Sequence, residues 1–105
     1  MEKTVHVVAI VTAEPGKRAQ LLQAFQANVP NVHAEDGCIE YVATVDAEGA
    51  GSSQTRFGED SFVVVEKWAS LAALEAHAAS PHMAAYAART KDLIASRSIH
   101  VLSPV

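Results

Sequence analysis

The residue types suited to acid–base chemistry gather in the second half of the chain, and His77 is the first candidate among them. Histidine changes its charge near neutral pH, which suits a general base. His77 stands three residues after Leu74, at the margin of an apolar stripe with helical spacing, so its ring can face the protein interior. A histidine at the edge of the core, hydrogen-bonded to a carbonyl group, is the structural alternative.

Glu66 and Trp68 stand two residues apart in an apolar segment that is typical of a strand, so their side chains share one face. A carboxylate in such a segment should not be buried without a partner, which His77 or Arg89 could supply. In the functional interpretation Glu66 orients the His77 ring, and Trp68 forms a cavity wall. The alternatives are a structural ion pair or an exposed edge position for Glu66, and ordinary core packing for Trp68.

Further side chains are predicted to line a cavity beside this pair. Tyr41 could donate a hydrogen bond to an oxygen of a bound molecule. His82, Met83 and Tyr86 follow the helix break at Pro81, and Met83 and Tyr86 fall on one helix face because they are three residues apart. Ordinary packing is the alternative for each of them.

The histidine spacing argues against a metal site. His77 and His82 are five residues apart, roughly 140° around a helix, and a proline intervenes. A helical zinc pair needs a spacing of four. Cys38 is the single cysteine, so no disulfide can form within the chain, and we expect a buried, inert thiol there.

The length of 105 residues and a hydrophobic content of 50% predict one domain over residues 1–105 with a substantial core. The net charge of −4 argues against a nucleic-acid partner, because a phosphate backbone favours a basic surface. The N-terminal residues 1–4 lack a signal-peptide layout, and no apolar run is long enough for a membrane span. We therefore expect a cytoplasmic protein.

Hydrophobic periodicity predicts the elements that must position these residues. Strands are expected over 5–12, 38–46, 62–68 and 99–102. A helix is expected from Lys17, with Pro30 kinking or splitting it near its end and Gly37 in a left-handed conformation beyond it. Ser70 is expected to cap a second helix, and Pro81 to begin a further one that runs through Ile94.

This order, βαββαβ, predicts an α+β fold of ferredoxin-like topology with an antiparallel sheet. Two helices can cover only one face of a four-stranded sheet. The strands are nevertheless apolar on both sides, with Val7 opposite Val8 in the first strand and Val64 opposite Val65 in the third. We therefore expect a homodimer formed through the sheet face. Residues 47–58 form a long polar loop of the kind that is functional or mobile.

Several motifs carry a family resemblance. The segment FVVVEKW at 62–68, followed by LEAH at 74–77 and SPHM at 80–83, resembles the antibiotic biosynthesis monooxygenase superfamily. The pairs VP at 29–30 and VD at 45–46, and EDGC at 35–38 with Tyr41, are similar to its bacterial quinol monooxygenase branch. The resemblance implies a dimeric α/β barrel with a cavity between sheet and helices. It also implies oxidation of quinols or related phenols by molecular oxygen, without metal, flavin or haem.

At several positions this chain lacks residues that are typical of two groups within the superfamily, which limits the chemistry expected of it. Haem-degrading members have an asparagine on the first strand, a tryptophan on the second helix and a later histidine, where this chain has Ala9, His77 and Ala87. Haem chemistry is therefore not expected. Some polyketide-tailoring members have an asparagine four residues before the strand tryptophan, where Val64 stands here.

Three hypotheses remain open from the sequence. The first is a cofactor-independent oxidoreductase with His77 as base, Glu66 as its orienter or a second proton acceptor, and Trp68, Tyr41 and the 82–86 segment around the substrate. The second is a non-catalytic dimeric module that binds a small aromatic compound or acts in a stress response. The third is an assembly domain whose cavity is vestigial.

Overall fold

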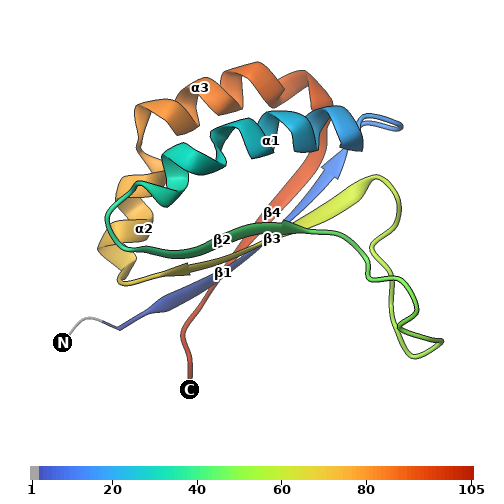
Figure 1. Cartoon of the computed structure of the whole chain (residues 1–105), viewed down its shortest axis with the longest axis horizontal. Helices are drawn as coiled ribbons and strands as arrows, with labels where there is room; N and C mark the ends of the chain where they lie inside the picture. The colour runs from blue at the N-terminus through green and yellow to red at the C-terminus, as the bar shows by residue number, and fades with distance from the viewer. Residues whose placement is uncertain (1–2) are drawn as a thin grey trace.

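The computed structural model describes residues 3–105; residues 1–2, part of the N-terminal segment considered above for a signal peptide, lie outside the described residues. Four antiparallel strands form one sheet in the order β2-β3-β1-β4. Three helices lie on one face of this sheet (Figure 1). The elements are β1 (Val5–Ala13), α1 (Arg18–His33), β2 (Cys38–Thr44), β3 (Ser61–Trp68), α2 (Leu71–Ala78), α3 (Pro81–Thr90), a short 3-10 helix η1 (Lys91–Leu93) and β4 (Ile94–Leu102). The predicted ferredoxin-like α+β fold is confirmed.

The strands direct alternate side chains to the two faces of the sheet. In β1 every second residue from Val5 to Ala13 is buried, and the intervening residues are half-buried. Antiparallel pairing places Val7 between Glu66 of β3 and Val101 of β4, so all three belong to the face under the helices. The same register therefore brings a carboxylate into the layer between sheet and helices.

Helix α1 buries a stripe made of Leu21, Phe25, Asn28 and Val32. Its spacing of four, three and four residues is that of one helix face. The helix is not split at Pro30. A proline three residues before the last helical residue removes one backbone hydrogen bond, while the last turn still closes through the Ala34 N–H, which donates to the Pro30 carbonyl at 3.2 Å.

The turn after α1 depends on Gly37. Its φ of +83° lies in the left-handed region that was predicted for it. A Cβ atom at this position would stand 2.6 Å from the Cβ of Ala73 in α2, so only glycine allows the turn to approach α2 this closely. The turn is further tied to the sheet because the Ala69 N–H donates to the Gly37 carbonyl at 2.8 Å. Glu35 is thereby held beside α2.

Helix α2 begins as predicted, with the Ser70 hydroxyl accepting from the Ala73 N–H at 3.1 Å. The prediction of the third helix was partly wrong. Pro81 does start α3, but the helix ends at Thr90, and the last strand starts at Ile94 instead of residue 99. Residues 95–102 are all exposed, so this edge strand has no buried side to reveal its period, and only pairing with β1 defines it.

The face of the sheet opposite the helices has no cover within the described residues (Figure 1). At its centre Val8, Ile10, Val63 and Val65 are half-buried by their sheet neighbours, and Val42 is 44% exposed. We call these five residues the open valine face. Among residues 3–105 there is also no helix with the length and apolar content needed to cross a membrane.

Candidate active site

A cavity of about 500 Å³ lies between the helices and the sheet. That volume falls within the range of small-molecule sites, and the lining is mostly apolar, as is usual for them. The sheet contributes Val7, Ala9, Val11, Tyr41, Phe62, Val64, Glu66, Arg97, Ile99 and Val101. The helices contribute Phe25, Leu71, Leu74, Glu75, His77, Ala78, Met83, Ala84, Tyr86 and Ala87, and Ile94 lies at the start of β4.

His77 is the one imidazole in the lining of this cavity. It sits in the last turn of α2 and is only 6% exposed. Its ring packs against the Trp68 indole, with centroids 4.6 Å apart, and meets the Tyr41 ring at 5.4 Å. Its Nδ1 lies 3.0 Å and 3.1 Å from the two carboxylate oxygens of Glu35. Since Nδ1 is engaged, Nε2 is the nitrogen available to a bound molecule.

The expectation that Glu66 orients His77 is not met. Glu66 is buried in β3, and its Oε1 accepts a hydrogen bond from Trp68 Nε1 at 2.9 Å. Burial raises the pKa of Glu66, while the Trp68 hydrogen bond and nearby His77 oppose that rise. Arg89, the other partner considered for Glu66, instead lies over the Tyr86 ring, 5.9 Å from its centroid.

Glu35 takes the orienting position because the turn after α1 brings it under α2. Its carboxylate is 17% exposed and contacts two histidines, since His82 Nε2 lies 2.5 Å from Oε1. Asn28 of α1 completes the group, with its Nδ2 3.2 Å from His82 Nδ1. We name Asn28, Glu35, His77 and His82 the Glu35 cluster. Among residues 3–105 no group of three or more His, Cys, Asp or Glu side chains is arranged to hold a metal ion.

Sequence reasoning missed both Glu35 and Asn28. Asn28 carried a usable signal, because it occupies the apolar stripe between Phe25 and Val32, where a polar side chain must find a buried partner. Glu35 lies three residues after Val32, on the continuation of the same stripe. Its contact with His77, 42 residues away, depends on the turn at Gly37 and is invisible to local spacing.

The other predicted cavity residues divide into two groups. Tyr41, Met83 and Tyr86 line the cavity, whereas His82 and Trp68 do not. His82 faces Glu35, because the first turn of α3 packs over the end of α1. Trp68 is fully buried behind His77 and supports its ring. A role for Tyr41, Met83 and Tyr86 in binding stays a prediction.

The tyrosine hydroxyls are kept neutral. Burial, and secondarily the Glu66 charge, raises the pKa of Tyr41 far above its ordinary value. Burial also raises the pKa of Tyr86, against the opposing effect of Arg97 and Arg89. Phe25 stacks on Tyr41 with centroids 5.2 Å apart, so this phenol is fixed in place. Both tyrosines can therefore donate a hydrogen bond into the cavity throughout the neutral pH range.

Comparison with known proteins places this arrangement in a family. The model of the antibiotic biosynthesis monooxygenase family matches residues 4–89. The chain belongs to the antibiotic biosynthesis monooxygenase family. The Escherichia coli (strain K12) protein named "Probable quinol monooxygenase YgiN" is 39% identical over 100 residues, which cover 93% of this chain and 95% of that protein.

Solved structures agree with this assignment to the antibiotic biosynthesis monooxygenase family. The crystal structure of PA3566 from Pseudomonas aeruginosa has a TM-score of 0.82 and 27% identity, covering 100% of this chain and 97% of that one. The structure of Rv0793 from Mycobacterium tuberculosis has a TM-score of 0.79 and 29% identity, covering 98% and 96%. The similarity therefore extends over the whole fold, including the elements that build the cavity.

In this family member the positions noted above as departures all lie in the cavity wall. Ala9, Val64 and Ala87 are among the lining residues, and each presents an apolar side chain. Polar atoms in the cavity come instead from Glu66, Glu75, His77 and the tyrosines, and at the β4 edge from Arg97. The cavity wall is therefore mostly apolar, and the candidate base, His77, enters it from α2.

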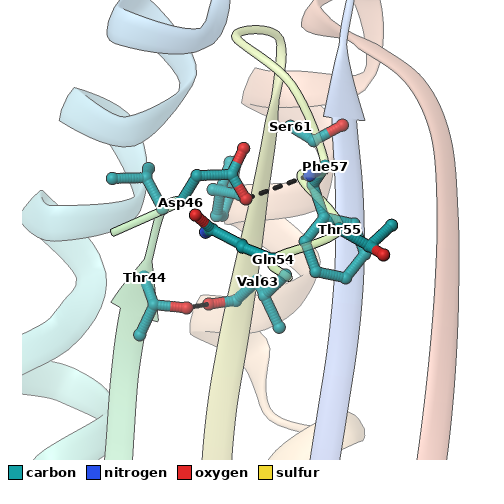
Figure 2. Close-up of a pocket in the computed structure, with 9 residues that line it drawn as sticks. Thr44, Asp46, Gln54, Thr55, Phe57, Ser61 and Val63 are labelled. Carbon is teal, nitrogen blue, oxygen red and sulfur yellow. Dashed lines mark hydrogen bonds between the residues drawn. The ribbon is translucent and has the colours of Figure 1, made fainter. Parts of the chain in front are cut away.

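A second, smaller hollow of about 190 Å³ lies where the loop between β2 and β3 leaves the sheet (Figure 2). The Asp46 carboxylate accepts from the N–H groups of Phe57 and Gly58, both at 2.9 Å, and these bonds lower its pKa. Arg18 donates to the Gly58 and Ser61 carbonyls at 3.3 Å and 3.1 Å. The loop is therefore clamped at its base, and it extends away from the helices (Figure 1).

Proposed function

We propose that this member of the antibiotic biosynthesis monooxygenase family oxidises quinols or related phenols with molecular oxygen in the cavity beneath its helices. His77 is the general base, and Glu35 is the residue that orients it. Tyr41, Met83 and Tyr86 contact the aromatic substrate. The name of the Escherichia coli relative, which is 39% identical, supports a quinol as the substrate class.

One observation carries this proposal: an oriented imidazole faces a mostly apolar cavity large enough for a one- or two-ring aromatic. Glu35 holds His77 Nδ1 at 3.0 Å, which leaves Nε2 for the substrate hydroxyl. Apolar surroundings keep bulk water away from a reactive anion. An imidazole nitrogen with a free lone pair can take the proton of a substrate hydroxyl as a general base.

The chemistry balances without a cofactor because the substrate anion itself supplies the electrons. His77 Nε2 takes the hydroxyl proton, and the electron-rich anion reduces oxygen. A quinol that gives up two electrons and two protons yields a quinone and hydrogen peroxide. A phenol that takes up one oxygen atom and loses two hydrogens yields a quinone and water. The family name favours the second stoichiometry.

Oxygen consumption by the purified, metal-free protein against a panel of quinols and phenols tests the proposal. We expect uptake well above the spontaneous rate for at least one naphthalene-type substrate, and ¹⁸O from labelled oxygen in its product. Binding of the panel without faster uptake would favour a ligand-binding module. Neither binding nor uptake would leave only the fold and the family.

We propose in addition that a second copy of the chain covers the open valine face. The face is apolar at its centre and has no cover within the described residues. Two such faces packed together would remove these side chains from water, and twofold pairing of identical surfaces is the commonest form of assembly.

A further inference from the structure

A continuous line of hydrogen bonds runs from the outer surface of α1 to the candidate base. Asn31 Nδ2 lies 3.0 Å from Asn28 Oδ1, and Asn28 Nδ2 lies 3.2 Å from His82 Nδ1. His82 Nε2 lies 2.5 Å from Glu35 Oε1, and Glu35 Oε2 lies 3.0 Å from His77 Nδ1. The five side chains come from four segments of the chain: α1, the turn after it, α2 and α3.

The direction of each hydrogen bond in this line is fixed by its neighbours. Asn28 Oδ1 accepts from Asn31, and Asn28 Nδ2 also approaches the Met83 sulfur at 3.4 Å, an atom that can only accept. The Asn28 amide is therefore oriented with its N–H groups toward His82. A nitrogen that receives an N–H carries a lone pair, so the proton of a neutral His82 lies on Nε2 and is donated to Glu35.

We propose that Asn28 and His82 are positioning residues that fix the tautomer of His77. With His82 Nε2–H donating to Glu35 Oε1, the carboxylate is held as an acceptor beside His77, whose Nδ1 lies 3.0 Å from Oε2 and 3.1 Å from Oε1. A neutral His77 then carries its proton on Nδ1 and presents a bare Nε2 to the cavity. This inference rests on the proposed function, because it concerns how the proposed base is held.

The same arrangement closes one route for the proton. Transfer from His77 through Glu35 to His82 would require a vacant Nε2 on His82, but Asn28 keeps the proton at that atom. A proton taken from a substrate hydroxyl therefore stays on His77 until a group in the cavity accepts it. The reduced oxygen species formed from the same substrate is the acceptor that the proposed reaction provides.

Nitrogen-detected NMR of the histidine rings tests this without any substrate. At a pH where the imidazoles are neutral, we expect the protonated nitrogen to be Nε2 in His82 and Nδ1 in His77. Asn28→Asp replaces the donor with an acceptor, so we expect a proton to appear on His82 Nδ1. A wild-type His82 protonated on Nδ1, or no change in Asn28→Asp, would overturn the assignment, whether or not the protein oxidises a quinol.

Kinetics with a conservative pair of variants tests the positioning role. His82→Gln retains an N–H near the place of Nε2, whereas His82→Leu removes it. We expect His82→Leu to lower kcat about 10-fold with little change in KM, and His82→Gln to restore most of the loss. Equal kcat in wild type and a folded His82→Leu would refute the role, while an inactive wild type would count against the proposed function alone.

Discussion

The imidazole of His77 and the indole of Trp68 lie 4.6 Å apart between centroids, with 35° between their planes. The same indole donates through Nε1 to Glu66, so one buried tryptophan both backs the candidate base and satisfies the neighbouring carboxylate. Two carboxylates thus flank His77 with different tasks: Glu35 contacts its ring, and Glu66 faces the cavity.

These different tasks predict different kinetic effects. Glu35→Gln keeps the size of the side chain but removes the charge that accepts two N–H groups, so we expect kcat to fall about 10- to 100-fold. Glu66→Gln keeps the bond from Trp68 and leaves the His77 contact intact, so we expect a smaller loss. Steady-state oxygen uptake by the two variants decides between them. A larger loss in Glu66→Gln would return the orienting role to Glu66.

Glu66 also predicts a pH dependence of stability. Its pKa in the folded protein is raised above the ordinary value of 4.5, chiefly by burial, so folding favours the protonated form. The stabilisation is complete below the unfolded pKa and is lost as pH rises through the folded pKa. We therefore expect the free energy of unfolding of the wild type to fall relative to that of Glu66→Gln as the pH rises from about 4.

Urea denaturation of both proteins across this range measures the difference, with each unit of raised pKa corresponding to about 1.4 kcal/mol. Glutamine does not titrate, so the Glu66→Gln variant is the reference for the pH effects of all other groups. A gap between the two proteins that stays constant, or that moves in the opposite direction, would contradict the burial of Glu66.

The clamp at the base of the β2–β3 loop predicts protease sensitivity. Asp46→Ala removes the acceptor for the Phe57 and Gly58 N–H groups, so the loop should open and trypsin should cleave after Arg56 several times faster. Glu48→Ala is the matched control. Glu48 is almost fully exposed, and like that of Asp46 its carboxylate lies near the Arg56 side chain, at 3.9 Å, so this variant also removes an acidic neighbour of Arg56. Equal cleavage of both variants would show that Asp46 does not hold the loop.

The proposed dimer can be tested with one charge. Val42 is 44% exposed on the open valine face, so Val42→Lys should be tolerated by a monomer but not by two faces packed together. We expect sedimentation to show a dimer for the wild type and a monomer for Val42→Lys. Gln26→Lys, on the exposed side of α1, should stay dimeric. A wild type that is monomeric at micromolar concentration would remove the dimer from the account.

Most of the fold could be predicted because buried strands and helices have different hydrophobic periods. The segment from Val5 to Ala13 is almost entirely apolar or β-branched, which predicts a strand, and its burial alternates from residue to residue. The positions of Ser70 and Pro81 set the starts of two helices. The last strand was predicted five residues too short, because an exposed edge strand has no buried side to give it a period.

The site could be predicted only in part. His77 was found because it is a titratable side chain beside an apolar stripe, and it does line the cavity. Its partner Glu35 was missed, because a contact over 42 residues depends on the backbone turn at Gly37 and the closeness of α2. Glu66 was preferred since it shares a strand face with Trp68, but that geometry serves the indole instead.

The central claim is that His77 removes a proton from a quinol or phenol in this cavity. Oxygen uptake with the best substrate of the panel, compared between wild type and His77→Ala, tests it most directly, with Gln23→Ala on the outer side of α1 as a control and circular dichroism to verify folding. We expect the rate above the spontaneous background to fall about 100-fold or more in His77→Ala and to be unchanged in Gln23→Ala. A folded His77→Ala protein that consumes oxygen at the wild-type rate would contradict the account.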